Sequence, residues 1–567
     1  MLIAIAVAIS ATLMVTMTAR AFVARASCSN RPILVNIEAS YDIAPAVQVV
    51  ARAFNNQNYL AGGRCVEVQI NQSDSYAVAG QIDGQAPVAG ADPIDAWIPD
   101  SSLWVDVARS YPAGAQVVQP TGIEVARSPL MIVTSKKIED QTHVLGGTVG
   151  WNLLLPPSLG GPPANLHLAV DLPDPADSAT GLATIIEVNR QLGNGAAGRQ
   201  GFTNFVYNTE ATAEFNSSAA LASFVSSTNP LSGRRSLTIS SEQAVLAYDR
   251  ANPGQLLAAR YPIGSSPSLG APELDYPYVL TTSLPAPSQA ASEFGRYLQH
   301  SYAVSVLRYY GFRSARGVPD AMPASFGLDS QLLQPATPPV ASEVATTLQS
   351  WKTLGLGTRE LFLIDVSAAM NQPDGNGTQT LEQELTATAS IGVGLFPDNS
   401  AAGLWEVGNG VQSGKPYKGL VSIGPISAQY GLLSRREQLS QITAGLKSGT
   451  GGESLHDAIL AAYKGMTAGY APNAENAIVV LTAGVDDTRN DLPLKTLVAK
   501  LRSLYNPSRQ VEIIALMFGT HGDFSALTQI AHATDGVAYE IASPADVVSV
   551  FIKGMTHRIC NQSCAAP

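Results

Sequence analysis

Basic residues are scarce in this sequence, and charge of either sign is low. The 567 residues include 34 Lys and Arg against 45 Asp and Glu, which gives a net charge of −11. Charged residues make up 14% of the chain, whereas roughly 25% is usual for a soluble protein. A nucleic-acid binder needs clustered Lys and Arg to replace the counterions of phosphate groups. The composition therefore excludes nucleic acid as a partner.

Long apolar runs are also few. Only residues 1–18 form an uncharged stretch long enough to enter a bilayer, which excludes a polytopic transporter or channel. Two Ala-x-Ala sequences follow, at 19–21 and 24–26. Residues 1–26 are therefore predicted to be either a cleaved signal peptide or a retained N-terminal membrane anchor. If it is retained, this segment attaches the protein to the membrane.

Cysteine is rare, and its four residues are Cys28, Cys65, Cys560 and Cys564. Cys28 precedes a predicted strand at 33–37, and Cys65 precedes another at 66–70. If these strands are parallel neighbours, their sulfurs lie at the same end of a sheet, within reach of a disulfide. Among the three connectivities, the local one, Cys28–Cys65 and Cys560–Cys564, is favoured. Two disulfides would indicate an exported, oxidised protein. The alternative to the Cys560–Cys564 disulfide is a metal site of His557, Cys560 and Cys564.

Apolar strand runs alternate with helical patterns along the whole chain, for example at 130–133 and 166–170. This alternation is typical of the α/β class, with parallel sheets covered by helices. Five prolines between 319 and 339 interrupt the pattern, because proline fixes φ and prevents a helix from continuing. The domain boundaries that we expect are a first domain at 28–318, a linker at 319–345, a second domain at 346–558 and a C-terminal tail at 559–567.

Three motifs in the second half follow one another in a recognisable order. An apolar strand at 361–367 contains Asp365 and Ser367, a Gly-Gly turn at 451–459 opens a helix, and a buried strand at 477–484 ends in a turn. In this order they resemble a von Willebrand factor type A domain. The resemblance implies a doubly wound, Rossmann-like fold that holds a divalent cation at the carboxyl edge of its sheet.

The metal-binding pattern of that family is incomplete here. The resemblance implies Asp365 and Ser367 as ligands, but Ala369 stands at the second serine position, Glu453 at the threonine and Ala483 at the aspartate. Mg²⁺ demands near-octahedral oxygen coordination, and the two alanines supply no donor. Direct coordination of Mg²⁺ or another divalent cation by Glu453, with Asp365 and Ser367, is one interpretation. The favoured one is a degenerate site on a scaffold that contacts an extracellular protein partner without metal.

The first half carries more widely spread motifs, at residues 38–43, 95–104, 127–133, 174–181, 275–280 and 311–313. These segments resemble the two-lobed, periplasmic-binding-protein-like domains of the molybdate- and sulfate-type extracellular solute-binding superfamily. Such a domain followed by a von Willebrand A domain is an architecture of exported actinobacterial proteins.

Hydroxyl side chains recur in these segments where a strand gives way to a helix. A helix N-terminus presents free N–H groups and the positive end of a dipole, so it holds an anion without arginine. The same residue types are also ordinary helix caps. The candidate ligand-binding residues are Ser40, Ser101, Ser102, Ser128, Ser178 and Thr180. Glu242 is predicted to line the cleft too, where it would repel an anion, so the charge of the solute stays open.

No motif supports catalysis. The Gly-x-Gly-x-x-Gly sequence at 193–198 follows a helical pattern, whereas a dinucleotide loop must follow a strand. The seven histidines are scattered, and there is no Gly-x-Ser-x-Gly elbow. We therefore expect a non-enzymatic cell-envelope protein, secreted or membrane-anchored, that captures a small solute or anion and docks a protein partner. The alternative is a ligand-less structural, adhesion or assembly protein of the cell surface.

Overall fold

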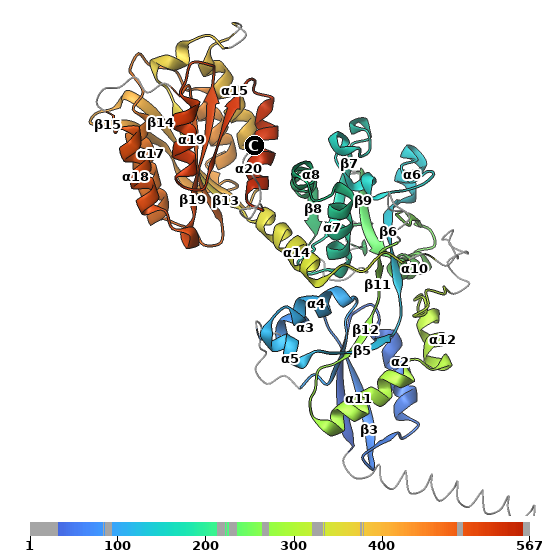
Figure 1. Cartoon of the computed structure of the whole chain (residues 1–567). Coiled ribbons are helices and arrows are strands. Elements are labelled where there is room, and N and C mark those ends of the chain that lie inside the picture. The colour runs from blue at the N-terminus through green and yellow to red at the C-terminus, as the bar shows by residue number, and fades with distance from the viewer. Residues whose placement is uncertain are drawn as a thin grey trace, which may run out of the picture. The chain divides into compact units, whose positions relative to one another are not determined.

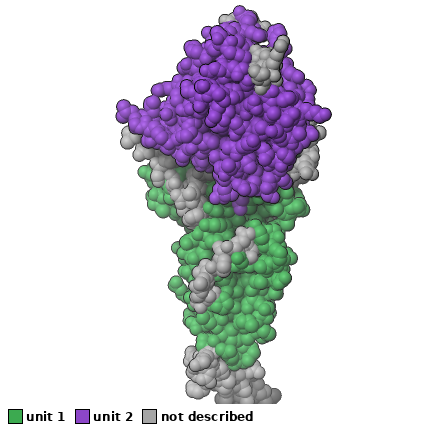
Figure 2. Space-filling model, turned by 90° about the vertical axis from the view of Figure 1, so that its left-hand side faces the viewer, with its two compact units in different colours: residues 1–351 green, residues 352–567 purple. Residues whose placement is uncertain are grey.

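The computed structural model describes residues 32–82, 84, 93–212, 221–222, 224–225, 235–262, 271–319, 333, 335–374, 377, 379–484 and 491–559. The chain divides into two compact units, residues 1–351 and 352–567, coloured separately in Figure 2. Both units are α/β structures in which helices cover sheets (Figure 1), so the predicted fold class is confirmed. The predicted signal peptide or anchor lies outside the described residues. Among the helices described, none combines the length and apolar character needed to cross a bilayer.

The first unit contains two lobes, each built on its own six-stranded sheet. In the first lobe the strand order is β2 (Leu60–Ala61), β3 (Arg64–Gln72), β1 (Ile33–Ala39), β4 (Ala96–Ile98), β12 (Pro277–Leu280) and β5 (Gln119–Glu124). Strands β3, β1 and β4 are parallel, and β12 is antiparallel to both of its neighbours. Six helices accompany this sheet: α2 (Ala44–Asn55), α3 (Ser75–Ile82), α4 (Ser102–Arg109), α5 (Pro112–Val117), α11 (Pro285–Tyr297) and α12 (Ser301–Tyr309).

The strands predicted next to the first two cysteines are neighbours. β1 and β3 run parallel, with Ile33 opposite Val66. Cys65 is 4% exposed and disulfide-bonded. Cys28, Cys560 and Cys564 lie outside the described residues, so the predicted pairing stays a prediction.

The sheet of the second lobe has the strand order β10 (Leu257–Arg260), β6 (Ser128–Ser135), β9 (Arg235–Ser241), β7 (Leu168–Pro173) and β8 (Thr209–Thr212), with β11 (Glu273–Leu274) also paired to β6. Its helices are α6 (Lys136–Thr142), α7 (Ala179–Leu192), α8 (Ala196–Tyr207) and α10 (Glu242–Ala251). The chain passes between the lobes more than once. Where it enters the second lobe, Arg127 exchanges backbone hydrogen bonds with Arg313, which lies in an isolated β-bridge just after α12.

Helix α14 (Ala341–Gly355) begins inside the segment predicted as a linker. Its first turns belong to the first unit, because the Glu343 carboxylate accepts hydrogen bonds from Arg190 of α7 at 2.7 and 2.8 Å. Farther along, the Trp351 indole N–H donates to Asp174 at 2.9 Å. These contacts fix α14 against the second lobe of the first unit.

The second unit is a doubly wound domain, as the resemblance implies. Its strand order is β15 (Lys415–Pro425), β14 (Ala401–Gln412), β13 (Thr358–Asp365), β18 (Glu475–Thr482), β19 (Val511–Phe518) and β20 (Val537–Ile541). All neighbours are parallel except β15, which is an antiparallel edge strand. The parallel strands read as apolar runs because helices bury both faces of the sheet.

Alternate residues of β13 point to the two helical layers. Leu361 and Leu363 pack with α17 (Leu455–Ala468), α18 (Leu494–Leu504) and α19 (Phe524–His532). Phe362 and Ile364 face the other layer, formed by α15 (Leu381–Leu395), α16 (Arg435–Ala444) and α20 (Asp546–His557). Figure 1 shows α17 and α18 on the side of the sheet opposite α15 and α20. Because the strands from β14 to β20 in this sheet are parallel, their carboxyl ends lie at one edge of it.

Candidate functional site

The carboxyl edge of the first lobe's sheet carries a group of buried polar residues. They follow the parallel strands β1, β3 and β4, which all end at this edge, and they precede the antiparallel strand β12, which starts there. Ser40 follows β1, Asp100 follows β4, and Tyr276 lies just before β12. Backbone hydrogen bonds join these three segments, from Ser40 N–H to Ile98 at 3.0 Å and from Tyr276 N–H to Asp100 at 3.3 Å.

Five polar atoms at the ends of these strands are buried without a hydrogen-bond partner. Two of them, Ser73 Oγ and Asp74 Oδ1, follow β3, and the other three are Ser40 Oγ, Asp100 Oδ1 and the hydroxyl of Tyr276. Ser40, Asp100 and Tyr276 are 5%, 8% and 0% exposed. Because proteins pair nearly all of their buried polar atoms, a cluster of unpaired ones at a lobe edge is unusual.

The predicted residues Ser101 and Ser102 lie at the start of α4, where each has a partner. Ser101 Oγ accepts the Leu103 N–H at 3.3 Å as an N-cap, and the Ser102 N–H donates to Asp275 Oδ1 at 2.7 Å. Asp275 belongs to the segment that leaves the second lobe, where the preceding Leu274 pairs with Ser128. The structure thus brings Ser102 and Ser128 to the junction of the two lobes.

The predicted hydroxyls of the second lobe also hold helix starts. Ser128 is fully buried, and its Oγ accepts the Gln243 N–H of α10 at 3.0 Å. Ser178 is the N-cap of α7 and accepts the Gly181 N–H at 3.4 Å, while Thr180 is fully buried in the first turn. Hydroxyl caps satisfy the free N–H groups of a helix N-terminus. The bonds made by Ser128 and Ser178 are of this capping kind.

Glu242 differs from its prediction. It does not line an open surface, because it is 1% exposed and both carboxylate oxygens are taken up inside the protein. The Arg313 guanidinium donates to both oxygens, at 2.6 to 3.1 Å, and the Tyr261 hydroxyl donates to Oε2. A carboxylate removed from water needs such a counterion. Glu242 therefore joins the second lobe to the segment that closes the first.

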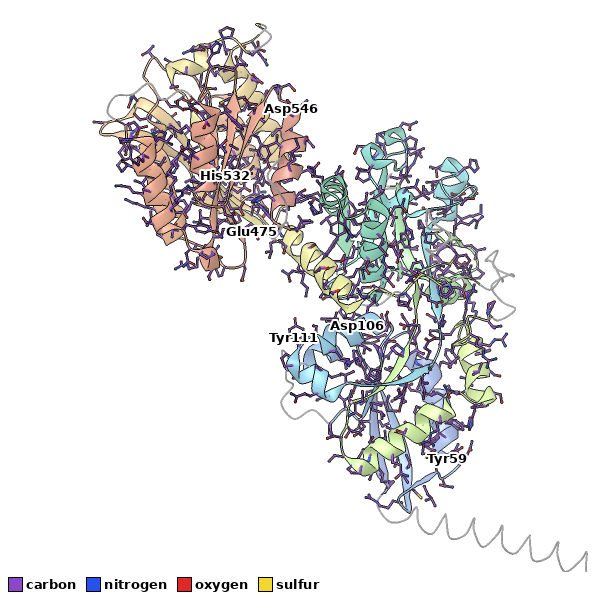
Figure 3. The ribbon with its side chains drawn as sticks, viewed as in Figure 1. Tyr59, Asp106, Tyr111, Glu475, His532 and Asp546 are labelled. Atoms are coloured by element: carbon purple, nitrogen blue, oxygen red, sulfur yellow. The ribbon has the colours of Figure 1, made fainter. Side chains whose placement is uncertain are left out.

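Carboxyl groups gather at the edge of the first lobe, and their burial favours the neutral form. Burial raises the pKa of Asp100 to about 7, and the neighbouring carboxylates of Asp42 and Asp275 raise it as well. Burial is also the main cause of the raised pKa of Asp275 and of Asp106, which is labelled on α4 in Figure 3. The pKa of Tyr276 lies well above its usual value for the same reasons.

Sequence reasoning missed Asp100 and Tyr276 as site residues. Both occur in segments that carry the resemblance, 95–104 and 275–280, but the emphasis on hydroxyls at helix starts passed over them. The signal that could have found Asp100 is its position directly after an apolar strand, beside two serines.

The second candidate site lies at the carboxyl edge of the second unit's sheet. Asp365, Ser367 and Glu453 are brought together there and are 3%, 1% and 1% exposed. Asp365 Oδ1 accepts the Ser367 N–H at 2.8 Å, and Oδ2 accepts the Thr482 hydroxyl at 3.0 Å and the Ala483 N–H at 3.3 Å. The Thr482 hydroxyl also lies within hydrogen-bond distance of Glu453 Oε1.

These residues fit a divalent cation poorly. Each oxygen of Asp365 already accepts a hydrogen bond from the protein, and Ala369 and Ala483 provide no side-chain donor. Ser367 Oγ is buried without a hydrogen-bond partner, but one hydroxyl does not make a cation site. In the part of the chain that is described, no three His, Cys, Asp or Glu side chains are placed to hold a metal ion. The site is therefore closed by hydrogen bonds among its own residues.

Comparison with known proteins agrees with this architecture. The sequence model of the family described as bacterial extracellular solute-binding protein matches residues 35–313. The model of the von Willebrand factor type A domain matches residues 361–551. Both are binding-protein families, generally without enzymatic activity, and the first implies a location outside the cytoplasm.

Similar proteins cover either most of the chain or one part of it. An uncharacterized protein of Mycobacterium tuberculosis is 24% identical over 559 residues, covering 94% of this chain and 78% of that protein. The sulfate-binding protein SubI of the same species is 18% identical, covering 55% of this chain and 96% of that one, with a TM-score of 0.37. A von Willebrand factor type A protein of Catenulispora acidiphila is 17% identical, covering 36% and 43%, with a TM-score of 0.28.

Because both TM-scores are below 0.5, the assignment rests on the two family matches and on the observed strand orders. The chain therefore contains a bacterial extracellular solute-binding domain, matched over residues 35–313, followed by a von Willebrand factor type A domain, matched over residues 361–551.

Proposed function

We propose that this protein is a non-enzymatic binding protein of the cell envelope, and that its first domain captures a small solute where its two lobes meet. The observation that carries the proposal is the group of buried, unpaired polar atoms in Ser40, Asp100 and Tyr276. A solute that supplies the missing hydrogen bonds would remove their desolvation cost. The match to a solute-binding family supports the same conclusion.

The hydroxyls predicted as solute contacts divide into two roles in this proposal. Ser40 has unused hydrogen-bonding capacity and contacts the solute directly. Ser101, Ser128 and Ser178 fix the helix starts around it through their capping bonds. Ser240 of the second lobe has a buried, unpaired hydroxyl and joins the candidates.

We assign partner docking to the second domain, through the carboxyl edge of its sheet and without metal. The hydrogen bonds that occupy both oxygens of Asp365 support a metal-free edge. The match to the von Willebrand factor type A family supports an interaction role, since doubly wound folds use this edge for binding.

The cell-envelope location rests on the solute-binding family and on the disulfide-bonded state of Cys65, because disulfides persist in oxidising compartments. Whether the N-terminal segment is cleaved or anchors the chain is decided by the mass of the mature protein.

The experiment that tests solute capture measures melting temperature and heat of binding for the full chain against a panel of small solutes. The panel contains oxyanions, amines, amino acids and sugars. We expect one class to raise the melting temperature saturably, because a ligand of the native state stabilises it by mass action. We also expect Ser40→Ala to weaken that binding, while the control Ser305→Ala, on the exposed face of α12, leaves it unchanged.

If no member of the panel binds, or if Ser40→Ala binds as tightly as the unmodified chain, solute capture at this junction is contradicted. The alternative function, a ligand-less structural or adhesion protein, then applies to both domains. It is already favoured for the metal site of the second domain, where Thr482 bonds Asp365 and lies within hydrogen-bond distance of Glu453.

A further inference from the structure

The proposed solute site has a charge and a hydrogen-bonding pattern that restrict the solute. Burial is the main cause of the raised pKa of Tyr276, and three nearby carboxyl groups, Asp42, Asp100 and Asp275, raise it further. A fourth carboxyl group, Asp106 of α4, is close enough to Asp275 for electrostatic repulsion between the two. Bringing an anion beside these groups would add like-charge repulsion in a poorly solvated place, where it is weakly screened.

Two of the arginines near this edge are already engaged by other carboxylates, and a third, Arg109, acts electrostatically on Asp106. Arg127, at the crossover between the lobes, donates to Glu124 and to Glu273. Arg313 donates to Glu242. Neither guanidinium is left to balance the charge of Asp100, and no basic group is among the neighbours that shift its pKa, so a cationic solute would supply the counterion.

The unpaired atoms also define which hydrogen bonds the solute makes. Ser40 Oγ, Asp100 Oδ1 and the Tyr276 hydroxyl are each able to accept a hydrogen bond. Two backbone hydrogen bonds connect their segments, at 3.0 and 3.3 Å, so the three residues belong to one point of the sheet edge. An alkylammonium group presents three N–H donors on one positively charged atom.

We propose that the first domain binds a protonated primary amine, whose ammonium group is held by Asp100, Ser40 and Tyr276. The inference rests on the proposed function and narrows it to a cationic solute. It separates this chain from oxyanion recognition, in which N–H and O–H groups surround the ligand.

The test is isothermal titration of the full chain at pH 8 with n-propylamine, ethanolamine and 1,4-diaminobutane, compared with sulfate and molybdate. Tetramethylammonium, a cation without N–H donors, separates charge attraction from hydrogen bonding. We expect saturable binding of at least one primary amine, and none of sulfate, molybdate or tetramethylammonium.

Two variants locate the bound amine. Asp100→Asn keeps the shape of the side chain and removes its charge, so we expect affinity to fall about 10- to 100-fold, as for a lost charge-assisted hydrogen bond. Tyr276→Phe removes one neutral hydrogen bond, and we expect a loss of about 2- to 10-fold. The matched controls Asp140→Asn and Tyr111→Phe, on exposed side chains elsewhere in the first unit, leave affinity unchanged.

A second measurement needs no variant. A bound ammonium favours the ionised form of Asp100, whose pKa is about 7 in the empty protein, so amine binding at pH 7 releases protons. The heat of binding then depends on the ionisation enthalpy of the buffer. Binding without proton release would place the amine away from Asp100 and overturn the assignment.

The outcomes distinguish a failure of the amine proposal from a failure of solute capture. Binding of sulfate or molybdate with no amine binding overturns the amine proposal but leaves solute capture standing. An amine that binds Asp100→Asn as tightly as the unmodified chain also overturns it. If no probe and no member of the wider panel binds, ordered water satisfies the three atoms, and both proposals fail.

Discussion

Two buried glutamates share one arginine at the amino edge of the second domain's sheet, and this arrangement predicts a pH-dependent stability. Glu360 of β13 is 3% exposed and Glu512 of β19 is 8% exposed. Arg558, directly after α20, lies 3.7 Å from Glu360 and also acts on Glu512. Burial raises the pKa of each carboxyl to about 7, more than Arg558 lowers it.

The sign of the effect follows from proton binding. An unfolded glutamate has its ordinary pKa of 4.5, so between pH 4.5 and 7 the folded state retains protons that the unfolded state has lost. The free energy of unfolding therefore falls as pH rises through this window, and the loss is complete above pH 7. A difference of roughly 2.5 pKa units corresponds to about 3 kcal/mol for one carboxyl.

Glu512→Gln removes one of the two buried carboxyl groups, so that Arg558 interacts with Glu360 alone. We expect this variant to be more stable than the unmodified chain at pH 8, by about 1 to 3 kcal/mol, and nearly equal to it at pH 4.5. The exposed Glu540→Gln on β20 serves as the control and leaves the pH dependence unchanged. Hydrogen exchange of β19 amides in the full chain, followed from pH 5 to 8, reports the second domain separately from the first.

The reasoning is refuted if Glu512→Gln is equally stable or less stable than the unmodified chain at pH 8. A gain in stability that does not vary with pH would also contradict it, because the proposed cause is the ionisation of a buried carboxyl.

Three further predictions concern the rest of the chain. Arg313→Met leaves Glu242 buried without its counterion and lowers the stability of the first domain by about 3 to 5 kcal/mol in thermal melting; Glu242→Gln in addition recovers most of the loss. Gly295→Ala places a Cβ 2.8 Å from the ring of Tyr278 and destabilises by about 1 to 3 kcal/mol, whereas Gly465→Ala, with open space around its Cβ, does not. Millimolar Mg²⁺ or a chelator leaves the melting of the second domain unchanged, and a Mg²⁺-dependent rise would restore the cation site as a working hypothesis.

The sequence patterns predicted the elements well because the parallel strands are apolar runs. The run at 361–367 overlaps β13, and the run at 477–484 overlaps β18. The strand-to-helix corners at Ser101 and Ser178 follow from the same alternation, whereas Ser128, predicted at such a corner, is the first residue of strand β6. The hydroxyl bonds of Ser101 and Ser178 to helix N–H groups are local, so residue type and spacing were sufficient to expect them as caps.

The chemistry of the first site depends on contacts that spacing does not encode. Tyr276 lies beside Asp100 because β12 inserts antiparallel to β4, although the two residues are far apart in the chain. Glu242, predicted to line the cleft, is instead paired with Arg313, which comes from the segment after α12. In the second domain, Thr482 bonds Asp365 and lies within hydrogen-bond distance of Glu453. Thr482 is not a position of the metal motif, so the motif alone did not predict these contacts.

The central claim is that Ser40, Asp100 and Tyr276 form the contact point of a small solute. Its most direct test is a crystal structure of the full chain grown with the solute of the panel that binds most tightly. The account predicts difference density within hydrogen-bond distance of Ser40 Oγ, Asp100 Oδ1 and the Tyr276 hydroxyl. Density for the solute elsewhere, with only water beside these three atoms, would contradict it.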